Sequence, residues 1–181
     1  MRARHLLAGA LTAGLTLLAA TPAAAQSNTE TATPVIPANS KWEPYRTSGF
    51  TAPAGLLCEF PLASEPLIDE ERVAVLDTFD DGSPRKELYM GDLRVRYTNL
   101  DTGATVEVDL GGIAFVEYGA DGSYVMTSIG PVGFGFRPTD GYPAGMWTFD
   151  GYHQVYTAPQ RAYREVLVDH GTEHNVCTDL D

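Results

Sequence analysis

Apolar and polar residues alternate with a period of two along most of the chain from residue 56 onward, as in β-strands with one buried face. Asp-, Asn- and Gly-rich turn sequences such as DDGSP, NLDTG and GADG separate the alternating runs. Only residues 64–72 have a pattern that could form a helical turn. The pattern as a whole therefore predicts an all-β chain. The predicted strands are residues 56–63, 71–79, 85–89, 92–98, 104–110, 112–118, 123–129, 132–136, 146–149, 152–157 and 162–169.

The register of one hairpin follows from the segment DLRVRYTNLDTGATVEVDL. A turn at LDTG, with Gly103 at positive φ, places Arg96 opposite Glu107 and Arg94 opposite Asp109. The alternate apolar residues of both strands then face the core together. Opposite charges across the two strands agree with the turn and with the apolar face, so this hairpin is the most specific local prediction.

About ten short strands in succession form an antiparallel meander, and we expect the meander to close into a barrel, with a β-sandwich as the alternative. The sequence VGFGF at residues 132–136 is typical of a strongly bent strand, with large side chains on one side and glycines on the crowded side.

The first 25 residues have the features of a secretory signal peptide. Arg2 and Arg4 precede an apolar run at residues 6–20, and three alanines end at Ala25. The run is shorter than the roughly 20 residues that a membrane-spanning helix needs. We therefore expect a secreted, extracellular protein with a flexible Ser/Thr/Pro-rich segment at residues 26–53 and a single β domain at residues 54–181.

The chain is acidic, with 24 Asp and Glu against 12 Lys and Arg and a formal net charge of −12. Removal of residues 1–25 takes away two basic residues and no acidic ones, which leaves a formal net charge of −14. Such a chain is repelled by phosphate backbones and by anionic lipid, so we expect no nucleic-acid partner and no adsorption to anionic lipid. After signal removal we also expect no membrane span, because no other apolar run is long enough.

Two cysteines, Cys58 and Cys177, lie near the two ends of the predicted domain. In an oxidising compartment an even pair most simply forms one disulfide. Two free thiols or a catalytic pair are the alternatives, and the long separation is unlike that of a C-x-x-C motif.

The sequence DHGTEHNVC contains the spacing H-x-x-E-H, formed by His170, Glu173 and His174, which occurs in one class of zinc proteases. There both histidines lie on one helix, and a third ligand follows far downstream. Here Gly171 follows the first histidine, the preceding run is β-like, and seven residues remain after the motif. The pattern therefore does not predict a protease.

A simpler metal site remains as a weak candidate. His153, His170 and His174 could share an ion if the chain near residues 151–152 meets the end of the last strand. Residues 77–82 resemble the start of a calcium-binding loop, but Phe79 and Leu88 stand where oxygen ligands are needed. We therefore assign no metal and no cofactor, and residues 77–82 are predicted to be a hairpin turn.

The loop at residues 137–145 is the longest turn-rich stretch of the domain, and Arg137, Tyr142 and Trp147 are candidate binding residues. No catalytic residue is assigned, because neither G-x-S-x-G nor a phosphate-binding glycine motif occurs. We expect a monomeric binding module for a small apolar ligand or for an extracellular protein or glycan. A barrel enzyme of the cyclase or isomerase kind and an extracellular structural or inhibitory protein are the alternatives.

The paired sequences LLCEFPL and DHGTEHNVC, with hairpins of the NLDTGATVEVDL and EYGADGSYV type, resemble a group of small secreted proteins of high-GC Gram-positive bacteria. The resemblance covers most of residues 55–181. It implies a secreted β fold and structural roles for the two cysteines. The group has no assigned activity, so no catalytic residue is carried over from it.

Overall fold

The computed structural model describes residues 40–181, which form twelve strands and two short 3-10 helices. The predicted signal peptide and the first part of the segment 26–53 lie outside the described residues. The all-β prediction is confirmed. The elements are β1 (Trp42–Pro44), β2 (Phe50–Ala52), β3 (Leu62–Asp69), β4 (Arg72–Thr78), β5 (Pro84–Met90), β6 (Leu93–Asn99), β7 (Thr105–Asp109), β8 (Ile113–Tyr118), β9 (Tyr124–Ile129), β10 (Val132–Phe136), β11 (Gly145–Thr157), η1 (Pro159–Arg161), β12 (Arg164–Asn175) and η2 (Val176–Asp179).

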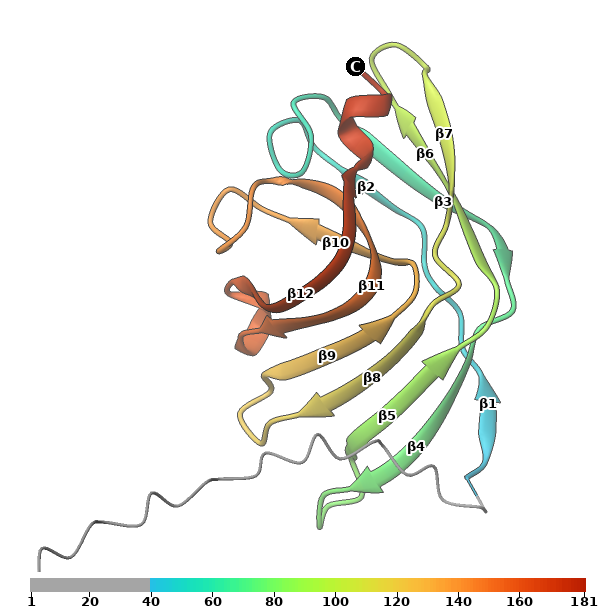
Figure 1. The fold of residues 1–181 in the computed structure, drawn as a ribbon, viewed down its shortest axis with the longest axis vertical. Helices are drawn as coiled ribbons and strands as arrows, with labels where there is room; N and C mark the ends of the chain where they lie inside the picture. The colour runs from blue at the N-terminus through green and yellow to red at the C-terminus, as the bar shows by residue number, and fades with distance from the viewer. Residues whose placement is uncertain (1–39) are drawn as a thin grey trace, which may run out of the picture. The chain divides into compact units, whose positions relative to one another are not determined.

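The strands form two antiparallel sheets (Figure 1). One sheet has the order β1-β4-β5-β8-β9-β11-β10, with β12 also paired to β11, and the other has the order β2-β3-β6-β7. Short bends connect β3 to β4, β5 to β6, β7 to β8 and β9 to β10. The first three of these bends carry the chain from one sheet into the other, so the molecule is a meander of bent strands.

Glycines at these bends allow neighbouring chains to approach closely. A Cβ atom at Gly112 would lie 2.6 Å from the carbonyl oxygen of Pro131. Gly91 has a φ of +138°, and a Cβ atom there would lie 2.7 Å from Cα of Glu71. A side chain at either position would push the bends apart, so glycine is needed where the strands change direction.

The predicted barrel closure is not found among the described residues. β8 and β9 pair with each other, but their continuations β7 and β10 do not, because β10 pairs instead with the first half of β11. At the other end of the meander, β12 pairs with β11 and not with β1 or β2. The result is two separate sheets, which is nearer to the sandwich alternative than to a closed barrel.

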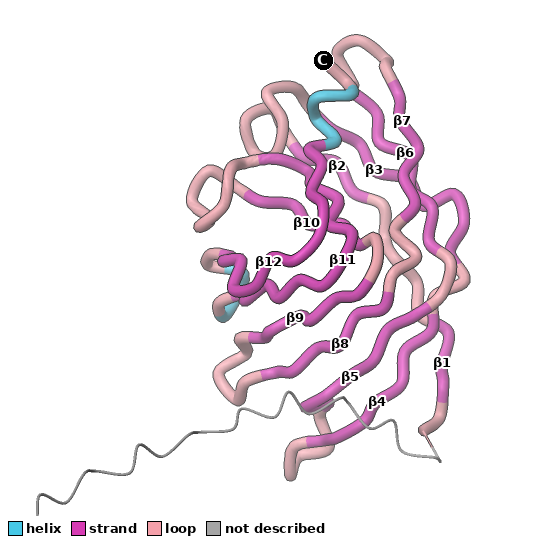
Figure 2. The backbone as a smooth tube through the Cα atoms, viewed as in Figure 1, coloured by secondary structure: helices cyan, strands magenta, loops and turns pink. Residues whose placement is uncertain are grey.

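A disulfide joins Cys58, in the loop between β2 and β3, to Cys177 in η2, which confirms the predicted pairing. Its Cα atoms are 5.6 Å apart, and the two residues are separated by 119 positions in the sequence. Close to it, Nδ2 of Asn99 donates a hydrogen bond of 2.9 Å to the buried carbonyl oxygen of Leu180. These two links hold the chain end beside the tip of the β6–β7 hairpin (Figure 2).

Two groups of buried side chains form the core. The first lies around the disulfide and the four-stranded sheet, and includes Leu62, Val95, Tyr97, Met146, Val176 and Leu180. The second is aromatic and consists of Val132, Phe134, Phe136, Phe149 and Val155. β10 separates the two groups.

The alternation predicted for β10 is confirmed. Phe134 and Phe136 belong to the aromatic core. Gly133 lies on the crowded side of the strand, where a Cβ atom would come within 2.9 Å of Cδ1 of Leu110. A larger residue at position 133 would therefore displace the first core.

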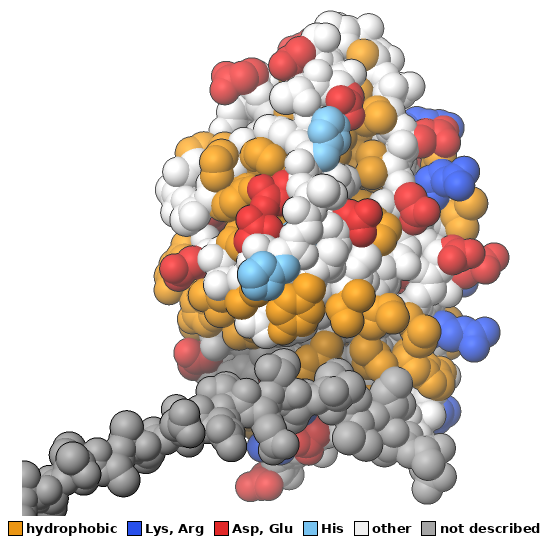
Figure 3. All heavy atoms as spheres, in the orientation of Figure 1, with side chains coloured by type: hydrophobic (Ala, Val, Ile, Leu, Met, Phe, Trp, Pro, Cys, Tyr) orange, Lys and Arg blue, Asp and Glu red, His pale blue; other side chains and the backbone are white. Residues whose placement is uncertain are grey.

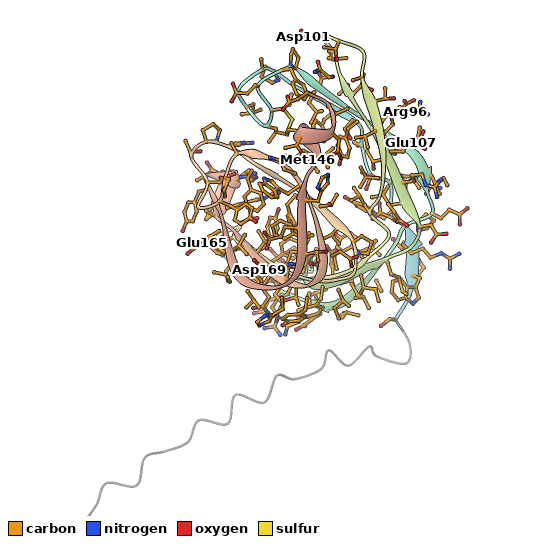
Figure 4. All side chains as sticks on the ribbon, turned by 45° about the horizontal axis from the view of Figure 1, so that its top comes forward. Arg96, Asp101, Glu107, Met146, Glu165 and Asp169 are labelled. Carbon is orange, nitrogen blue, oxygen red and sulfur yellow. A yellow bond between two sulfur atoms is a disulfide. The ribbon has the colours of Figure 1, made fainter. Side chains whose placement is uncertain are left out.

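The hairpin of β6 and β7 has the predicted register. Arg94 is paired with Asp109 and Arg96 with Glu107, and Gly103 has a φ of +78°. Nη2 of Arg96 donates a hydrogen bond of 2.8 Å to Oε1 of Glu107, and both side chains lie on the outer surface (Figure 4). The turn at residues 79–83 is likewise a hairpin turn between β4 and β5, with Gly82 at positive φ.

Several predicted boundaries are wrong. β1 and β2 lie in the segment expected to be a flexible tether, so β structure begins before residue 54. Residues 56–61 are a loop, and the stretch at residues 64–72 belongs to β3 and β4 instead of a helical turn. The strands expected at residues 146–149 and 152–157 are one strand, β11.

The segment DHGTEH lies beyond the last predicted strand except for Asp169, and it forms most of the second half of β12. It has little apolar alternation of its own, and its strand conformation is fixed by pairing with β11.

Candidate functional site

A cavity of about 670 Å³ lies between the two sheets. Its walls are mainly apolar, and side chains of both sheets contribute to them. Met146, one of these residues, lies in the interior of the molecule (Figure 4). This volume is within the usual range of sites for small organic ligands. The apolar lining residues include Phe50, Ala52, Leu56, Leu57, Leu93, Val95, Leu110, Ala114, Val116, Met126, Val132 and Met146.

The connection between β1 and β2 forms one rim of the cavity. Tyr45 and Phe50, which line the cavity, are 39% and 41% exposed. The Tyr45 ring packs edge-on against Tyr89, with the ring centroids 5.0 Å apart. Nearby, the hydroxyl of Thr47 donates a hydrogen bond of 2.5 Å to Glu71. Burial raises the pKa of Glu71, and the charge of the neighbouring Asp69 raises it further.

Behind this rim, two tyrosines of the cavity wall share one buried carboxylate. The hydroxyls of Tyr89 and Tyr118 donate hydrogen bonds of 2.6 Å and 2.8 Å to the same oxygen of Glu87. Burial raises the pKa of Tyr118 to about 12, and it also raises the pKa of Tyr89. Both phenols therefore stay protonated at neutral pH and act as hydrogen-bond donors.

A cluster of charged residues forms another part of the wall, and its centre is the fully buried carboxylate of Asp140. The backbone N–H groups of Arg137 and Arg164 donate to it at 2.6 Å and 2.9 Å, and the guanidinium of Arg161 donates at 3.0 Å and 3.1 Å. Although burial opposes ionisation, these donors lower the pKa of Asp140 below its ordinary value. The carboxylate is thus ionised and its oxygens are fully engaged.

The arginine cluster, by which we mean Arg137, Arg161 and Arg164, carries more positive charge than Asp140 neutralises. All three side chains line the cavity. Arg164 donates hydrogen bonds to the carbonyl oxygen of Gly135 at 3.0 Å and to the Tyr124 hydroxyl at 3.3 Å. Burial and the charge of Arg164 both lower the pKa of Arg161, as expected where cations crowd together.

Tyr124 responds to the same surplus of charge. Burial alone would raise the pKa of Tyr124, but the charges of Arg164 and Arg161, together with the hydrogen bonds to Thr157 and Arg164, outweigh this effect and lower the pKa below its ordinary value. A positive region thus lies inside a protein whose net charge is −12.

The backbone that presents Arg161 is strained. Gln160 and Arg161, in η1, have φ values of 55° and 60°, a region that residues other than glycine seldom adopt. The side-chain bonds of Arg161 to Asp140 and to the carbonyl oxygen of Gly135 hold this conformation. Strain of this kind is frequent at binding sites, where it fixes the position of a side chain.

Of the three predicted binding-loop residues, Arg137 lines the cavity and the other two do not. Tyr142 and Trp147 pack against the aromatic core, with their ring centroids 5.1 Å apart. Sequence reasoning missed Arg161, Arg164 and Tyr124, which no motif marks. The sequence RAYR at residues 161–164 could have indicated the arginine cluster, because it places two arginines at the start of a predicted strand in an acidic chain.

The three histidines proposed as a metal site are not brought together. On β12, His170 and His174 are exposed and have even positions, so they share one face of the strand. His153, on β11, pairs with Asp169 and lies with the odd-numbered residues of β12. His174 is instead linked to Asp179 at 2.7 Å. The prediction placed the correct strands side by side but assigned the wrong face of β12.

No protein-family model matches the chain, and neither a curated protein nor a solved structure matches it significantly. Within residues 40–181 there is no helix with the length and apolar character needed to cross a bilayer. The resemblance to secreted proteins of high-GC Gram-positive bacteria therefore stays a prediction. The functional argument rests on the cavity and its charged lining.

Proposed function

We propose that this domain binds a small amphipathic anion, with the apolar part in the cavity and the anionic group beside the arginine cluster. The observation that carries the proposal is the placement of three arginines around one carboxylate at the wall of a mainly apolar cavity. Their formal surplus of two positive charges favours a negatively charged group. In this view the two sheets act as an incompletely closed barrel around the ligand.

The chemistry of the wall supports this class of ligand. Guanidinium groups bind carboxylate and phosphate groups in bidentate geometry. Burial, and after it the charge of Arg164, lowers the pKa of Arg161, and a bound anion would offset both effects. The apolar residues of both sheets would cover a hydrocarbon chain or ring system. We further propose that binding takes place outside the cell, since the disulfide suits an oxidising compartment.

Binding of three probes with the same chain length and different head groups tests the proposal. Calorimetric titration with dodecanoate, dodecanol and dodecyltrimethylammonium should give affinities that fall in that order. Arg137→Gln should weaken dodecanoate binding about tenfold and leave dodecanol unchanged, because one favourable charge interaction of about 1.4 kcal/mol is lost. Arg137 is the best position, since its guanidinium makes one long contact, 3.5 Å to the carbonyl oxygen of Arg161.

Arg96→Gln is the matched control, because Arg96 lies on the outer surface and not in the cavity. Equal affinities for dodecanoate and dodecanol, or an equal effect of both substitutions, would refute an anion-specific site. Absence of binding by all three probes would refute a hydrophobic cavity site for chains of this size.

A second candidate function, an enzyme of the isomerase or cyclase kind, is favoured by Tyr124. The pKa of this phenol is lowered by Arg164, which suits a group that gives up and takes back a proton. Chromatography and NMR of a ligand recovered from the protein separate the two candidates. An unchanged ligand supports binding alone, and a rearranged ligand that Tyr124→Phe no longer forms supports catalysis.

A further inference from the structure

His153 is a fully buried histidine without a hydrogen-bond partner for either ring nitrogen. Its Nε2 atom lies 3.1 Å from Oδ1 of Asp169, but the two groups are not aligned for a hydrogen bond. A buried imidazole is normally satisfied, because leaving its donor and acceptor unpaired costs free energy. Neither ring nitrogen of His153 finds a hydrogen-bond partner among the described residues, so a further group bound there would satisfy one of them.

The pairing of β11 with β12 brings two carboxylates to this imidazole. Asp169 is the direct partner of His153, and Glu173 is the partner of Phe149 on the same face. One ligand atom from each of His153, Asp169 and Glu173 can be chosen so that all three lie within 4.8 Å of one another. Two atoms bound to one ion at about 2.1 Å lie at most about 4.2 Å apart, so small side-chain rotations would bring the set together.

A pair of glycines keeps the space beside the imidazole open. Gly171 lies between Asp169 and Glu173 on β12, opposite Gly151 on β11. A Cβ atom at Gly171 would lie 2.8 Å from Cε1 of His153, so any larger residue would displace the ring. Gly151 has a φ of +133°, a backbone conformation that residues with a side chain seldom adopt.

The carboxylates of Asp169 and Glu173 carry negative charge that no neighbouring cationic side chain in the described part of the chain neutralises. Among the described residues, no Lys or Arg forms an ion pair with Asp169 or Glu173. The interaction with Asp169 raises the pKa of Glu173, as expected for two neighbouring carboxylates, and the Tyr142 hydroxyl donates a hydrogen bond to Glu173. The Asp169 side chain is 43% exposed, which gives an ion access from solvent.

Figure 3 shows the outer surface over β12, where acidic side chains gather and histidines are visible. The exposed histidines of this strand are His170 and His174. They provide a natural comparison with His153, since they lie on the same hairpin but on the opposite face of β12.

We propose that His153, Asp169 and Glu173 bind a divalent transition-metal ion. One imidazole nitrogen and two carboxylates suit Zn²⁺, Mn²⁺ or Co²⁺, whereas Ca²⁺ and Mg²⁺ prefer sites made of oxygen alone. Three protein ligands leave coordination positions for water. The hydroxyl of Tyr142 orients Glu173 as an outer-shell partner. This site is separate from the cavity and does not depend on the function proposed for it.

Titration of the purified, EDTA-treated protein with Zn²⁺ and with Co²⁺ tests the proposal. We expect one ion per chain by calorimetry, a Co²⁺ absorption spectrum typical of nitrogen and oxygen ligands, and a change in the NMR signals of the His153 ring. Asp169→Asn and Glu173→Gln should each weaken Zn²⁺ binding at least about tenfold, because each removes a charged ligand.

His170→Gln and His174→Gln are matched controls and should bind Zn²⁺ as the unaltered protein does. Asp169→Asn is the main test variant, because Asp169 is partly exposed and its substitution should not prevent folding, as substitution of the buried His153 could. Failure to bind either ion, or loss of binding in the control variants with retention in Asp169→Asn, would overturn the proposal. Calcium binding as tight as zinc binding would also overturn it.

Discussion

Two groups of carboxylates beside the β11–β12 hairpin differ in how their charge is compensated. The buried carboxylate of Asp140 accepts hydrogen bonds from two backbone N–H groups and from the guanidinium of Arg161. The carboxylates of Asp169 and Glu173 have no arginine or lysine partner within residues 40–181, and the imidazole beside them has no hydrogen bond. The carboxylate of the first group is fully compensated by its neighbours, whereas the carboxylates of the second group lack the cation that we propose for them.

The difference shows that burial and charge alone do not identify a ligand site. Asp140 is the more buried carboxylate, yet its surroundings explain it entirely as the structural anchor of the arginine cluster. What remains unbalanced there is the positive charge facing the cavity. On the hairpin, what remains unbalanced is negative charge beside a buried imidazole. The unbalanced part of each group carries the proposal made for it, which is an anionic ligand in the cavity and a cation on the hairpin.

Removal of the disulfide should give the largest effect and should weaken both groups together, because Cys177 holds the end of β12. The double substitution Cys58→Ser with Cys177→Ser should lower the free energy of unfolding by about 4 kcal/mol, as expected for a closed loop of this length. Urea denaturation of the oxidised protein and of the variant measures the difference. A change below about 1 kcal/mol would mean that the hydrogen-bonded strands alone fix the chain end.

Asp140→Asn should lower the free energy of unfolding much more than Asp169→Asn does. The substitution leaves three crowded arginines without their anion, so the free energy of unfolding should fall by about 3 kcal/mol. The same change at Asp169 removes one of two repelling carboxylates, and in metal-free protein it should alter stability by less than about 0.5 kcal/mol. Equal losses in the two variants, measured by urea denaturation after EDTA treatment, would contradict the distinction.

The pH dependence of stability should have opposite signs at the two groups. The pKa of Asp140 is lowered on folding, so its contribution is present above its unfolded value near 3.8 and is lost as the pH falls through the folded value. The pKa of Glu173 is raised, so its contribution is present below its unfolded value near 4.5 and is lost as the pH rises through the folded value.

Denaturation of metal-free protein between pH 2.5 and 7 measures both effects. Asp140→Asn should reduce the loss of stability on the acid side, and Glu173→Gln should remove a decline of about 0.5 kcal/mol above pH 4.5, a small effect because Glu173 is only partly buried. An unchanged profile in Glu173→Gln would show that the two hairpin carboxylates do not interact in solution.

The sequence predicted well those features that depend on neighbouring residues. The β6–β7 hairpin has a short turn with Gly103 and two oppositely charged cross-strand pairs, so turn, charge and apolar face all specify one register. The disulfide was predictable because two cysteines have one pairing. The alternation in β10 was predictable because Gly133 and Phe134 differ so strongly in size.

Features that depend on distant residues were not predictable in the same way. The apolar run that contains Leu56 and Leu57 packs as a loop, because apolar content alone does not separate a buried loop from a strand. Of the three residues now proposed to bind a metal, the sequence placed His153 and Glu173 in separate candidates and did not mark Asp169. The grouping was missed because H-x-x-E-H was compared with a helix, in which His170 and His174 share a face with Glu173 nearby. On a strand, Glu173 points away from both histidines and toward His153.

The exposed ion pair between Arg96 and Glu107 should show the smallest effect of all, and it calibrates the two buried groups. Its atoms are 2.8 Å apart, close to the distances around Asp140, but both side chains are 39–45% exposed. Water screens such a pair, and ordering two long side chains offsets most of the attraction. A double-mutant cycle with Arg96→Gln and Glu107→Gln should therefore give a coupling free energy close to the experimental error. The same cycle applied to Asp140 and Arg161 gives the value for comparison. An equally large coupling for the exposed pair would mean that hydrogen-bond distance, and not burial, sets the strength of charged interactions in this protein. Asp140 and the hairpin carboxylates would then not differ for the reason given above.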